Sequence, residues 1–237
     1  MTQSKQGERV IVVTGASGAL GSEMMERFVR YGDSVVGWDI DAPGPGSLVR
    51  DERKRTLYWM NVDVTDAGVV DDAVDTVEQE IGPIDAFIHC AGGFRWSHID
   101  KISARDIDFL VDLNLRSSLY VAHSVLGSMK VRGQGRLIFI SSRSTIKPGA
   151  GEGAYAATKA GLNALTISLA DEVKESEITV NALQPSVIDT EANREDMPDA
   201  DFSTWVPRGE LVDLVEYLID DKARSISGSL IAVSGRT

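Results

Sequence analysis

The chain has 237 residues, a hydrophobic content of 43%, a charged content of 25% and a formal net charge of −12. This balance is typical of one soluble globular domain, and the negative charge argues against nucleic acid or an anionic membrane as a partner. No apolar run approaches the roughly 20 residues of a membrane-spanning helix, and residues 1–9 lack the apolar core of a signal peptide. A single cysteine, Cys90, excludes an intrachain disulfide framework, so we expect a reducing, cytoplasmic location.

A glycine-rich turn is the first motif in chain order. A β-branched run at residues 9–13 leads into T-G-A-S-G-A-L-G, residues 14–21, and a helical pattern follows. Gly15 permits the tight turn, Gly18 lets the backbone approach a pyrophosphate, and Gly21 lets the helix pack closely. The helix N-terminus then faces the negative charge. The order of strand, glycine turn and helix predicts a dinucleotide site.

An acidic residue ends the second predicted strand, residues 34–38. Asp39 lies about 20 residues past the glycines, where a carboxylate can accept hydrogen bonds from the adenosine ribose. It would also repel the extra phosphate of NADP, and no arginine follows it directly, so the sequence favours NAD. A solvent-exposed loop carboxylate is the alternative. Residues 40–53, rich in Pro, Gly and charge, are expected to form a surface loop.

Strand and helix patterns then alternate. A strand at residues 57–62 precedes a helix that ends at Gly82, and another strand follows at residues 84–89. Such alternation implies parallel βαβ units. We therefore predict one α/β domain over residues 1–237, a Rossmann-type doubly wound parallel sheet with flanking helices. Residues 10–135 would form mainly the cofactor half, and residues 136–237 the catalytic half.

The middle of the chain contains several single residues of interest. Cys90 has no basic partner nearby in the sequence, so we expect a small packing residue. Ser103 and Asp106 resemble a capping box that opens a long helix from residue 104 to about 129. Asn114 lies in the apolar part of that helix, where its amide must find a partner, hold a water or bend the helix. The three histidines have no metal-ligand spacing, so no metal is expected.

The pair Tyr155 and Lys159 carries the strongest chemical signal. Residues at i and i+4 share one helix face, so the phenol and the ammonium are expected to point the same way. A cation beside the phenol would lower the pKa of Tyr155 from about 10 and make it a usable acid or base. Ser142 ends an apolar strand and is placed to offer its hydroxyl to a substrate oxygen.

The last third reads as a strand at 178–182, a polar stretch, an amphipathic helix and a final strand at 229–233. The polar stretch, about 190–207, has Met197, Phe202 and Trp205 scattered through it. Apolar residues in such a stretch usually cover something, so we expect a lid over the substrate.

Together these residues resemble the short-chain dehydrogenase/reductase family over nearly the whole chain. The motifs that carry the likeness are Thr14 to Gly21, Asp39, Asp63, Ala91-Gly92, Asn114, Ser142 and Tyr155-x-x-x-Lys159. The resemblance implies that Tyr155 exchanges a proton with a substrate oxygen polarised by Ser142. Lys159 would hold the nicotinamide ribose, Asn114 would complete a water-linked proton relay to it, and the cofactor would carry the hydride.

The resemblance also implies the cofactor contacts and partners. NAD(H), preferred over NADP(H), would contact Gly15, Ser17, Gly18, Ala19, Leu20, Asp39, Asp63, Val64, Cys90, Ala91, Gly92, Tyr155, Lys159, Pro185, Ile188 and Thr190. The expected partner is a small alcohol or ketone substrate, and the expected assembly is a homotetramer or dimer built through the two long helices.

Three departures and one narrower likeness qualify this reading. Cys90 replaces a frequent Asn, Ser186 a common Gly, and residues 234–236 the usual Asp-Gly-Gly. Residues 189–205 are similar to the matching region of quinonoid dihydropteridine reductases, which prefer NADH but lack the catalytic serine. NADH-dependent pteridine reduction is therefore one alternative, and a non-catalytic nucleotide-binding protein on the same fold is another.

Overall fold

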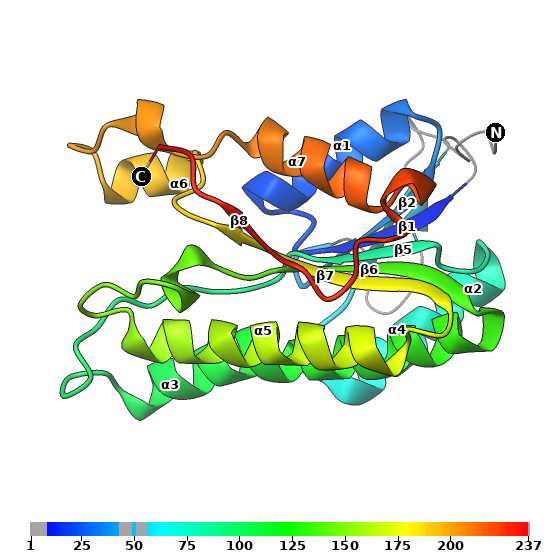
Figure 1. Ribbon diagram of the computed structural model, residues 1–237, viewed down its shortest axis with the longest axis horizontal. Helices are drawn as coiled ribbons and strands as arrows, with labels where there is room; N and C mark the ends of the chain where they lie inside the picture. The colour runs from blue at the N-terminus through cyan, green and yellow to red at the C-terminus, as the bar shows by residue number, and fades with distance from the viewer. Residues whose placement is uncertain (1–8, 43–48, 51–55, 237) are drawn as a thin grey trace.

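The computed structural model describes residues 9–42, 49–50 and 56–236 (Figure 1). Its first half contains β1 (Val10–Thr14), α1 (Ala19–Arg30), β2 (Ser34–Asp39), β3 (Val49–Arg50), β4 (Leu57–Asn61), α2 (Ala67–Glu80), β5 (Ala86–His89), α3 (Ala104–Val111), the π-helical turn η1 (Asp112–Arg116) and α4 (Ser117–Arg132). Its second half contains β6 (Gln134–Ile140), η2 (Arg143–Thr145), α5 (Gly153–Glu172), β7 (Glu177–Pro185), α6 (Glu191–Asp196), η3 (Phe202–Thr204), α7 (Arg208–Leu218), η4 (Asp221–Ala223) and β8 (Leu230–Val233).

The strands form one sheet in the order β3-β4-β2-β1-β5-β6-β7-β8. Every neighbouring pair is parallel except β3 and β4, which pair antiparallel at the edge. The chain winds outward in one direction from β1 to β2 and β4, and in the other from β5 to β8. The loops that follow β1 and β5 therefore diverge, which opens a crevice at the carboxyl ends of the two strands. The predicted doubly wound parallel sheet is confirmed.

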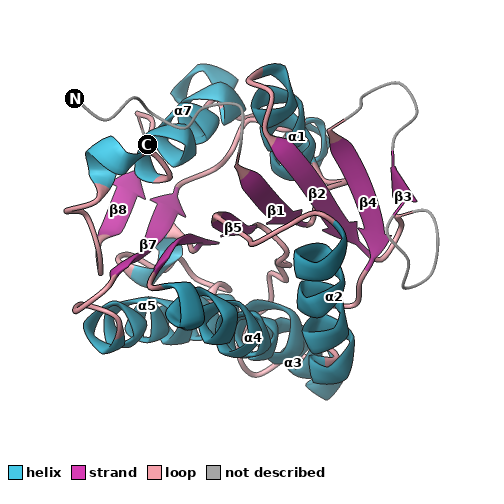
Figure 2. Ribbon diagram, turned by 90° about the vertical axis from the view of Figure 1, so that its right-hand side faces the viewer, coloured by secondary structure: helices cyan, strands magenta, loops and turns pink. Residues whose placement is uncertain are grey.

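Helices cover both faces of the sheet. Helices α1 and α7 lie on one face, and α2, α4 and α5 lie on the other (Figures 1 and 2). Alternate strand residues enter the two cores: Ile11 and Val13 join the core under α1 and α7, whereas Val12 joins the one under α2, α4 and α5. Full burial of one such side chain contributes about 1.5–3 kcal/mol, so packing on both faces holds the strand ends that carry the site.

The long helix predicted from residue 104 to about 129 is interrupted. Its start is confirmed, because Ser103 Oγ accepts a hydrogen bond from the Asp106 amide at 3.1 Å. Residues 112–116, however, form a π-helical turn between α3 and α4, and α4 continues to Arg132. The extra residue in this turn bulges the backbone, and apolar periodicity alone does not reveal it.

Two predicted loops also differ from expectation. The stretch 190–207 contains the short helices α6 and η3, and Trp205 is only 5% exposed, so its ring belongs to the packing beneath the stretch. Within 40–53, residues 49–50 form the edge strand β3, while 43–48 and 51–53 lie outside the described residues.

Candidate active site

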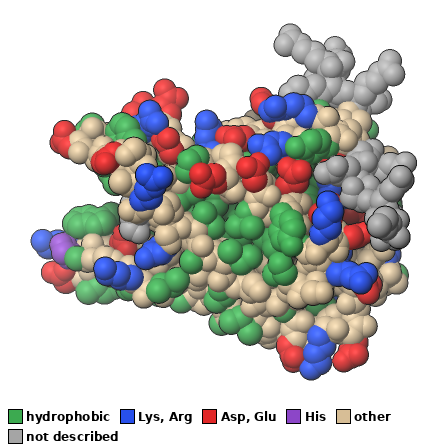
Figure 3. Space-filling model, turned by 45° about the horizontal axis from the view of Figure 1, so that its top comes forward, with side chains coloured by type: hydrophobic (Ala, Val, Ile, Leu, Met, Phe, Trp, Pro, Cys, Tyr) green, Lys and Arg blue, Asp and Glu red, His purple; other side chains and the backbone are tan. Residues whose placement is uncertain are grey.

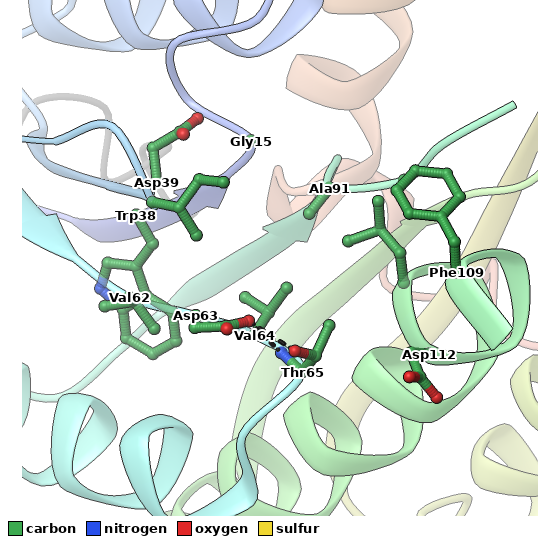
Figure 4. A pocket seen from close by; sticks show the side chains of 13 residues that line it. Gly15, Trp38, Asp39, Val62, Asp63, Val64, Thr65, Ala91, Phe109 and Asp112 are labelled. Carbon is green, nitrogen blue, oxygen red and sulfur yellow. Dashed lines mark hydrogen bonds between the residues drawn. The ribbon is translucent and has the colours of Figure 1, made fainter. Parts of the chain in front are cut away.

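A cavity of about 410 Å³ lies beside the carboxyl ends of β2 and β4 (Figure 4). We call it the Asp39 cavity. Its lining is Gly15, Trp38, Asp39, Ile40, Val62, Asp63, Val64, Thr65, Ala91, Gly92, Phe109, Asp112 and Leu113. Three of these residues carry carboxylates and none carries a cation. The Asp39 carboxylate is oriented by the Ser17 amide, which donates to its Oδ2 at 2.9 Å, and by the Asp41 amide at 3.2 Å.

A second cavity of about 600 Å³ lies on the other side of the glycine turn. We call it the Thr190 cavity. It is lined by Gly15, Gly18, Ala19, Leu20, Gly21, Cys90, Ile140, Ile188, Thr190, Glu191, Ala192 and Glu195. Gly15 lines both cavities, so the turn after β1 borders the two spaces.

The glycine turn fits a pyrophosphate. Gly18 precedes α1 and no side chain caps the helix, so the first amides of α1 have no side-chain partner and Gly18 to Gly21 line the Thr190 cavity. Gly15 has a φ of 62°, and a Cβ there would lie 3.0 Å from the Ala91 nitrogen. A Cβ on Gly21 would lie 2.2 Å from the Gly15 oxygen. Only glycine fits these two positions without a backbone shift.

Ser142 and Tyr155 are brought together from different elements. Ser142 follows β6 and is 8% exposed, and its Oγ accepts from the Ser144 amide at 3.1 Å. Tyr155 is in the first turn of α5 and is half-buried. The Ser142 hydroxyl lies within hydrogen-bonding reach of the Tyr155 phenol. The predicted juxtaposition of a serine hydroxyl and a phenol is therefore present.

Lys159 lies one turn further along α5 and is 5% exposed. Its Nζ donates to the Ile140 carbonyl at 2.8 Å. It also flanks Gly92, because a Cβ there would lie 3.1 Å from Lys159 Nζ and 3.0 Å from Asn114 Oδ1. Burial lowers the pKa of Lys159 to about 8. Asn114, Lys159 and the segment after β5 thus meet at one point beside the crevice.

The expected direction of the Tyr155 pKa shift is wrong for the structure. Burial raises the pKa of the phenol, the hydrogen bond from Ser142 lowers it, and the nearby Glu152 carboxylate raises it again. Desolvation of the charged form is the largest effect, and the Lys159 ammonium is directed instead toward the Ile140 carbonyl. Tyr155 is consequently a protonated phenol at neutral pH.

A buried hydrogen-bond chain runs beneath the site. The Ala91 amide donates to Thr14 Oγ1 at 3.0 Å, Thr14 Oγ1 lies 2.9 Å from His89 Nδ1, and His89 Nε2 lies 3.1 Å from Ser117 Oγ. Ser117 Oγ donates to the Leu113 carbonyl at 2.6 Å, so it accepts from His89, whose proton is assigned to Nε2. This chain joins the end of β5 to the π-turn that carries Asn114.

His89 and Cys90 are electrically neutral. Burial, and then the charge of Lys159, lower the pKa of His89 to about 3. Burial raises the pKa of the Cys90 thiol to about 12. Although Cys90 lines the Thr190 cavity, its sulfur lies 3.6 Å from Met24 Sδ. A neutral thiol in this setting packs and does not act as a nucleophile, as expected from the sequence.

Most predicted cofactor residues line the two cavities. The Asp39 cavity contains Gly15, Asp39, Asp63, Val64, Ala91 and Gly92, and the Thr190 cavity contains Gly15, Gly18, Ala19, Leu20, Cys90, Ile188 and Thr190. Ser17, Tyr155, Lys159 and Pro185 line neither. Cavity residues that sequence reasoning missed are Trp38, Ile40, Val62, Thr65, Phe109, Asp112, Leu113, Ile140, Glu191, Ala192 and Glu195. Thr65, directly after Asp63 and Val64, had a sequence signal; Phe109 and Asp112, on α3 and η1, had none.

Arg95, Arg143 and Arg194 each interact with a neighbouring side chain. Arg95 lies 4.1 Å above the Phe109 ring, Arg143 donates to Ser234 Oγ, and Arg194 forms a two-point pair with Asp189 at 2.6 and 2.8 Å. Among the described residues, no three His, Cys, Asp or Glu side chains are grouped to hold a metal. No helix in the described ranges is long and apolar enough to cross a bilayer.

Known proteins of similar sequence include a dehydrogenase and a reductase. The chain is 29% identical to gluconate 5-dehydrogenase of Gluconobacter oxydans, over 98% of this chain and 95% of that protein. It is also 29% identical to the 3-oxoacyl-(acyl-carrier-protein) reductase FabG of Salmonella typhimurium, over 96% of both chains.

Solved structures share the fold. A short-chain type dehydrogenase/reductase from Mycobacterium ulcerans superposes with a TM-score of 0.86 at 23% identity, covering 98% of this chain and 90% of that one. ElxO with NADP bound gives 0.86 at 17% identity, covering 96% and 98%. 4-Hydroxyisoleucine dehydrogenase complexed with NADH gives 0.82 at 24% identity, covering 96% and 97%.

The family model for short chain dehydrogenases matches residues 9–201, which contain the glycine turn, the Asp39 cavity and the Ser142–Tyr155–Lys159 group. The chain belongs to the short-chain dehydrogenase family and is an oxidoreductase of that family.

Proposed function

We propose that the protein transfers a hydride between NAD(H) and an alcohol or ketone, with Tyr155 as the proton donor or acceptor. The observation that carries the proposal is that the Ser142 hydroxyl meets the Tyr155 phenol one helical turn before Lys159, whose Nζ flanks Gly92. Because burial raises the pKa of Tyr155, the phenol is protonated at neutral pH and can donate to a carbonyl oxygen.

The residues around the two cavities fit a dinucleotide. The uncapped amides of α1 would hold the pyrophosphate, and the Thr190 cavity, with Ile188 and Thr190, would take the nicotinamide end. Lys159 would bind the ribose next to Gly92. When bound, the nicotinamide supplies or accepts the hydride. The chain's own part is to orient the substrate oxygen between Ser142 and Tyr155, with Asn114 beside Lys159 in a proton relay.

The carboxylates of the Asp39 cavity support NAD over NADP. Asp39, Asp63 and Asp112 line it, and its lining by described residues contains no Lys or Arg. A 2′-phosphate there would face the like charges of these carboxylates. The solved relatives do not decide this preference, because one was solved with NADP and another with NADH.

The test is Tyr155→Phe, assayed with NADH and a panel of ketones plus a quinonoid dihydropterin. We expect turnover to fall by at least about 100-fold while NADH binding, measured by fluorescence, stays within about twofold. Turnover of the dihydropterin alone would favour the pteridine-reductase alternative. Tight NADH binding with no turnover on any substrate would favour a nucleotide-binding protein without catalysis. Equal loss of NADH binding and turnover in Tyr155→Phe would count against Tyr155 as the proton donor.

We further propose a homotetramer or dimer built through α4 and α5, located in the cytoplasm. Leu119 on α4 and Ile167 on α5 support the interface, because they are 45% and 51% exposed. Light scattering on the purified protein, and on a Leu119→Glu variant, tests the assembly.

A further inference from the structure

Three aromatic side chains follow the end of β5 at alternate positions. Phe94, Trp96 and His98, which we call the aromatic strip, are all exposed, Phe94 by 48% and Trp96 by 59%. In Figure 3 the end of the molecule that carries α6 is notched, and hydrophobic side chains gather on the rim opposite the α6 lobe. The loops after β5 and β6 form that side of the molecule (Figure 1).

The strip begins at the proposed proton donor. The rings of Phe94 and Tyr155 meet edge to face, with centroids 4.9 Å apart and an interplanar angle of 86°. A substrate whose oxygen reaches the Tyr155 hydroxyl therefore has its remaining atoms within reach of the Phe94 ring. Exposed aromatic surface at this position is available to the substrate.

The Trp96 side chain is fixed by contacts with the loop after β6. Its Nε1 donates to the Ala150 carbonyl at 2.9 Å, and its ring rests on Gly151, where a Cβ would lie 2.4 Å from Trp96 Cε2. The Ser97 amide donates to the Gly151 carbonyl at 3.0 Å, which ties the two loops together. The His98 ring meets the indole at 5.1 Å. Because the rings are fixed before binding, little side-chain entropy is lost when a ligand packs on them.

Arg95, which lies between Phe94 and Trp96 in the sequence, directs its guanidinium away from them toward Phe109 and Asp106. Arg95 lies over the Phe109 ring at 4.1 Å and pairs with Asp106 at 3.5 Å. Phe94 and Trp96 thus present uncharged ring surface, and aromatic rings bind other rings through offset and edge-to-face contacts more favourably than area alone predicts.

We propose that the substrate carries a flat aromatic ring that packs on Phe94 and Trp96 while its carbonyl oxygen lies at Tyr155. The inference rests on the proposed function for the position of the oxygen. It names the substrate class as aryl-substituted ketones and the corresponding alcohols, and it makes Phe94 and Trp96 specificity residues.

The test compares 1-phenylpropan-2-one with 1-cyclohexylpropan-2-one, which have the same carbon skeleton and an unconjugated carbonyl. We expect the wild type to prefer the phenyl ketone by about three- to tenfold in kcat/KM, and Phe94→Leu and Trp96→Leu each to reduce that ratio toward one. Tyr217→Leu is the matched control, because Tyr217 is a 47% exposed aromatic on α7, which lines neither cavity. It should keep the wild-type ratio. A wild-type ratio near one, or a ratio that survives both variants, overturns the proposal.

A binding measurement separates this inference from the proposed chemistry. Calorimetry on Tyr155→Phe with saturating NADH gives the dissociation constants of the two ketones without turnover. Tighter binding of the phenyl ketone to Tyr155→Phe, lost in the double variant Tyr155→Phe/Trp96→Leu, supports the role of the aromatic strip. If the wild type reduces neither ketone, that failure contradicts only the proposed reaction. Equal binding of both ketones overturns the strip whatever the activity.

Discussion

The side-chain amide of Asn114 forms hydrogen bonds with both the backbone N–H and the backbone carbonyl of Gly93. Asn114 Nδ2 donates to the Gly93 carbonyl at 2.9 Å, and Asn114 Oδ1 accepts from the Gly93 amide at 2.9 Å. The amide also reaches Thr158 Oγ1 at 3.3 Å, on the helix that carries Tyr155. One buried side chain in the π-turn therefore joins the segment that leads to the aromatic strip with α5, which explains why a polar residue lies in an apolar helix face.

Asn114→Ala should lower kcat/KM by at least about tenfold, because two backbone groups of Gly93 lose their partner and Lys159 loses its neighbour. Steady-state kinetics with NADH below the unfolding temperature measures the effect. Asn181→Ala is the matched control: Asn181 is also fully buried, and its amide donates to the Ile226 carbonyl and accepts from the Ser229 amide away from the cleft. It should lose stability and keep its turnover. The same loss of kcat/KM in both variants would show that Asn114 acts only through stability.

Asp39→Asn should shift cofactor preference toward NADPH. The change keeps the shape of the side chain and removes a like charge from the proposed 2′-phosphate position, so we expect the NADPH/NADH ratio of kcat/KM to rise about tenfold or more. Asp63→Asn is the control on the same cavity, where the carboxylate binds the Thr65 amide and hydroxyl, and it should change the ratio less than about threefold. An unchanged ratio in Asp39→Asn would contradict the assignment of NAD through this residue.

The stability of Lys159→Met relative to wild type should be greatest at neutral pH and should fall as the pH rises. The pKa of Lys159 is about 8 in the folded chain and 10.5 as a reference, so folding is penalised while the buried amine is charged. Below pH 8 the penalty is complete, on the order of 3 kcal/mol, and between pH 8 and 10.5 the unfolded chain binds more protons and the penalty disappears. Urea unfolding of both proteins from pH 7 to 10.5 should show that the stability of the variant minus that of the wild type falls as pH rises. A gap that does not change with pH would refute this explanation.

His89 should make the protein sensitive to acid. The pKa of His89 is about 3 in the folded chain and 6.5 as a reference. Below pH 6.5 the unfolded chain therefore binds a proton that the folded chain does not bind, and the folded state loses stability. Between pH 7.5 and 5 this amounts to a loss of about 2 kcal/mol, measured as the change in the stability difference between wild type and His89→Asn. Ser117→Ala removes the hydrogen bond to His89 but keeps the imidazole, so its stability should depend on pH as steeply as that of the wild type. Parallel slopes in wild type and His89→Asn would exclude the role of the histidine.

Features encoded in short stretches could be predicted from the sequence. Local sequence patterns predict the strands and the glycine turn at Gly15 to Gly21. The same holds for the shared helix face of Tyr155 and Lys159, which follows from their i, i+4 spacing. The alternation of strand and helix then leaves few topologies, because parallel βαβ connections have one hand. The doubly wound sheet was accessible for this reason, whereas the family and the roles of the candidate catalytic residues came from the resemblance of the motifs to a known family.

Features that arise when distant segments dock were decided only by the tertiary structure. The π-turn at Asn114, the raised pKa of Tyr155 and the ring contact of Phe94 with that phenol each depend on how far a group is removed from water and on which segment packs against it. Gly93 and Thr158 lie far from Asn114 in the chain, and no spacing rule connects them. The sequence alone determined the motif residues of the site. The packing of β5, α5 and the π-turn decided their contacts and protonation, because desolvation and hydrogen bonding are properties of the assembled surroundings.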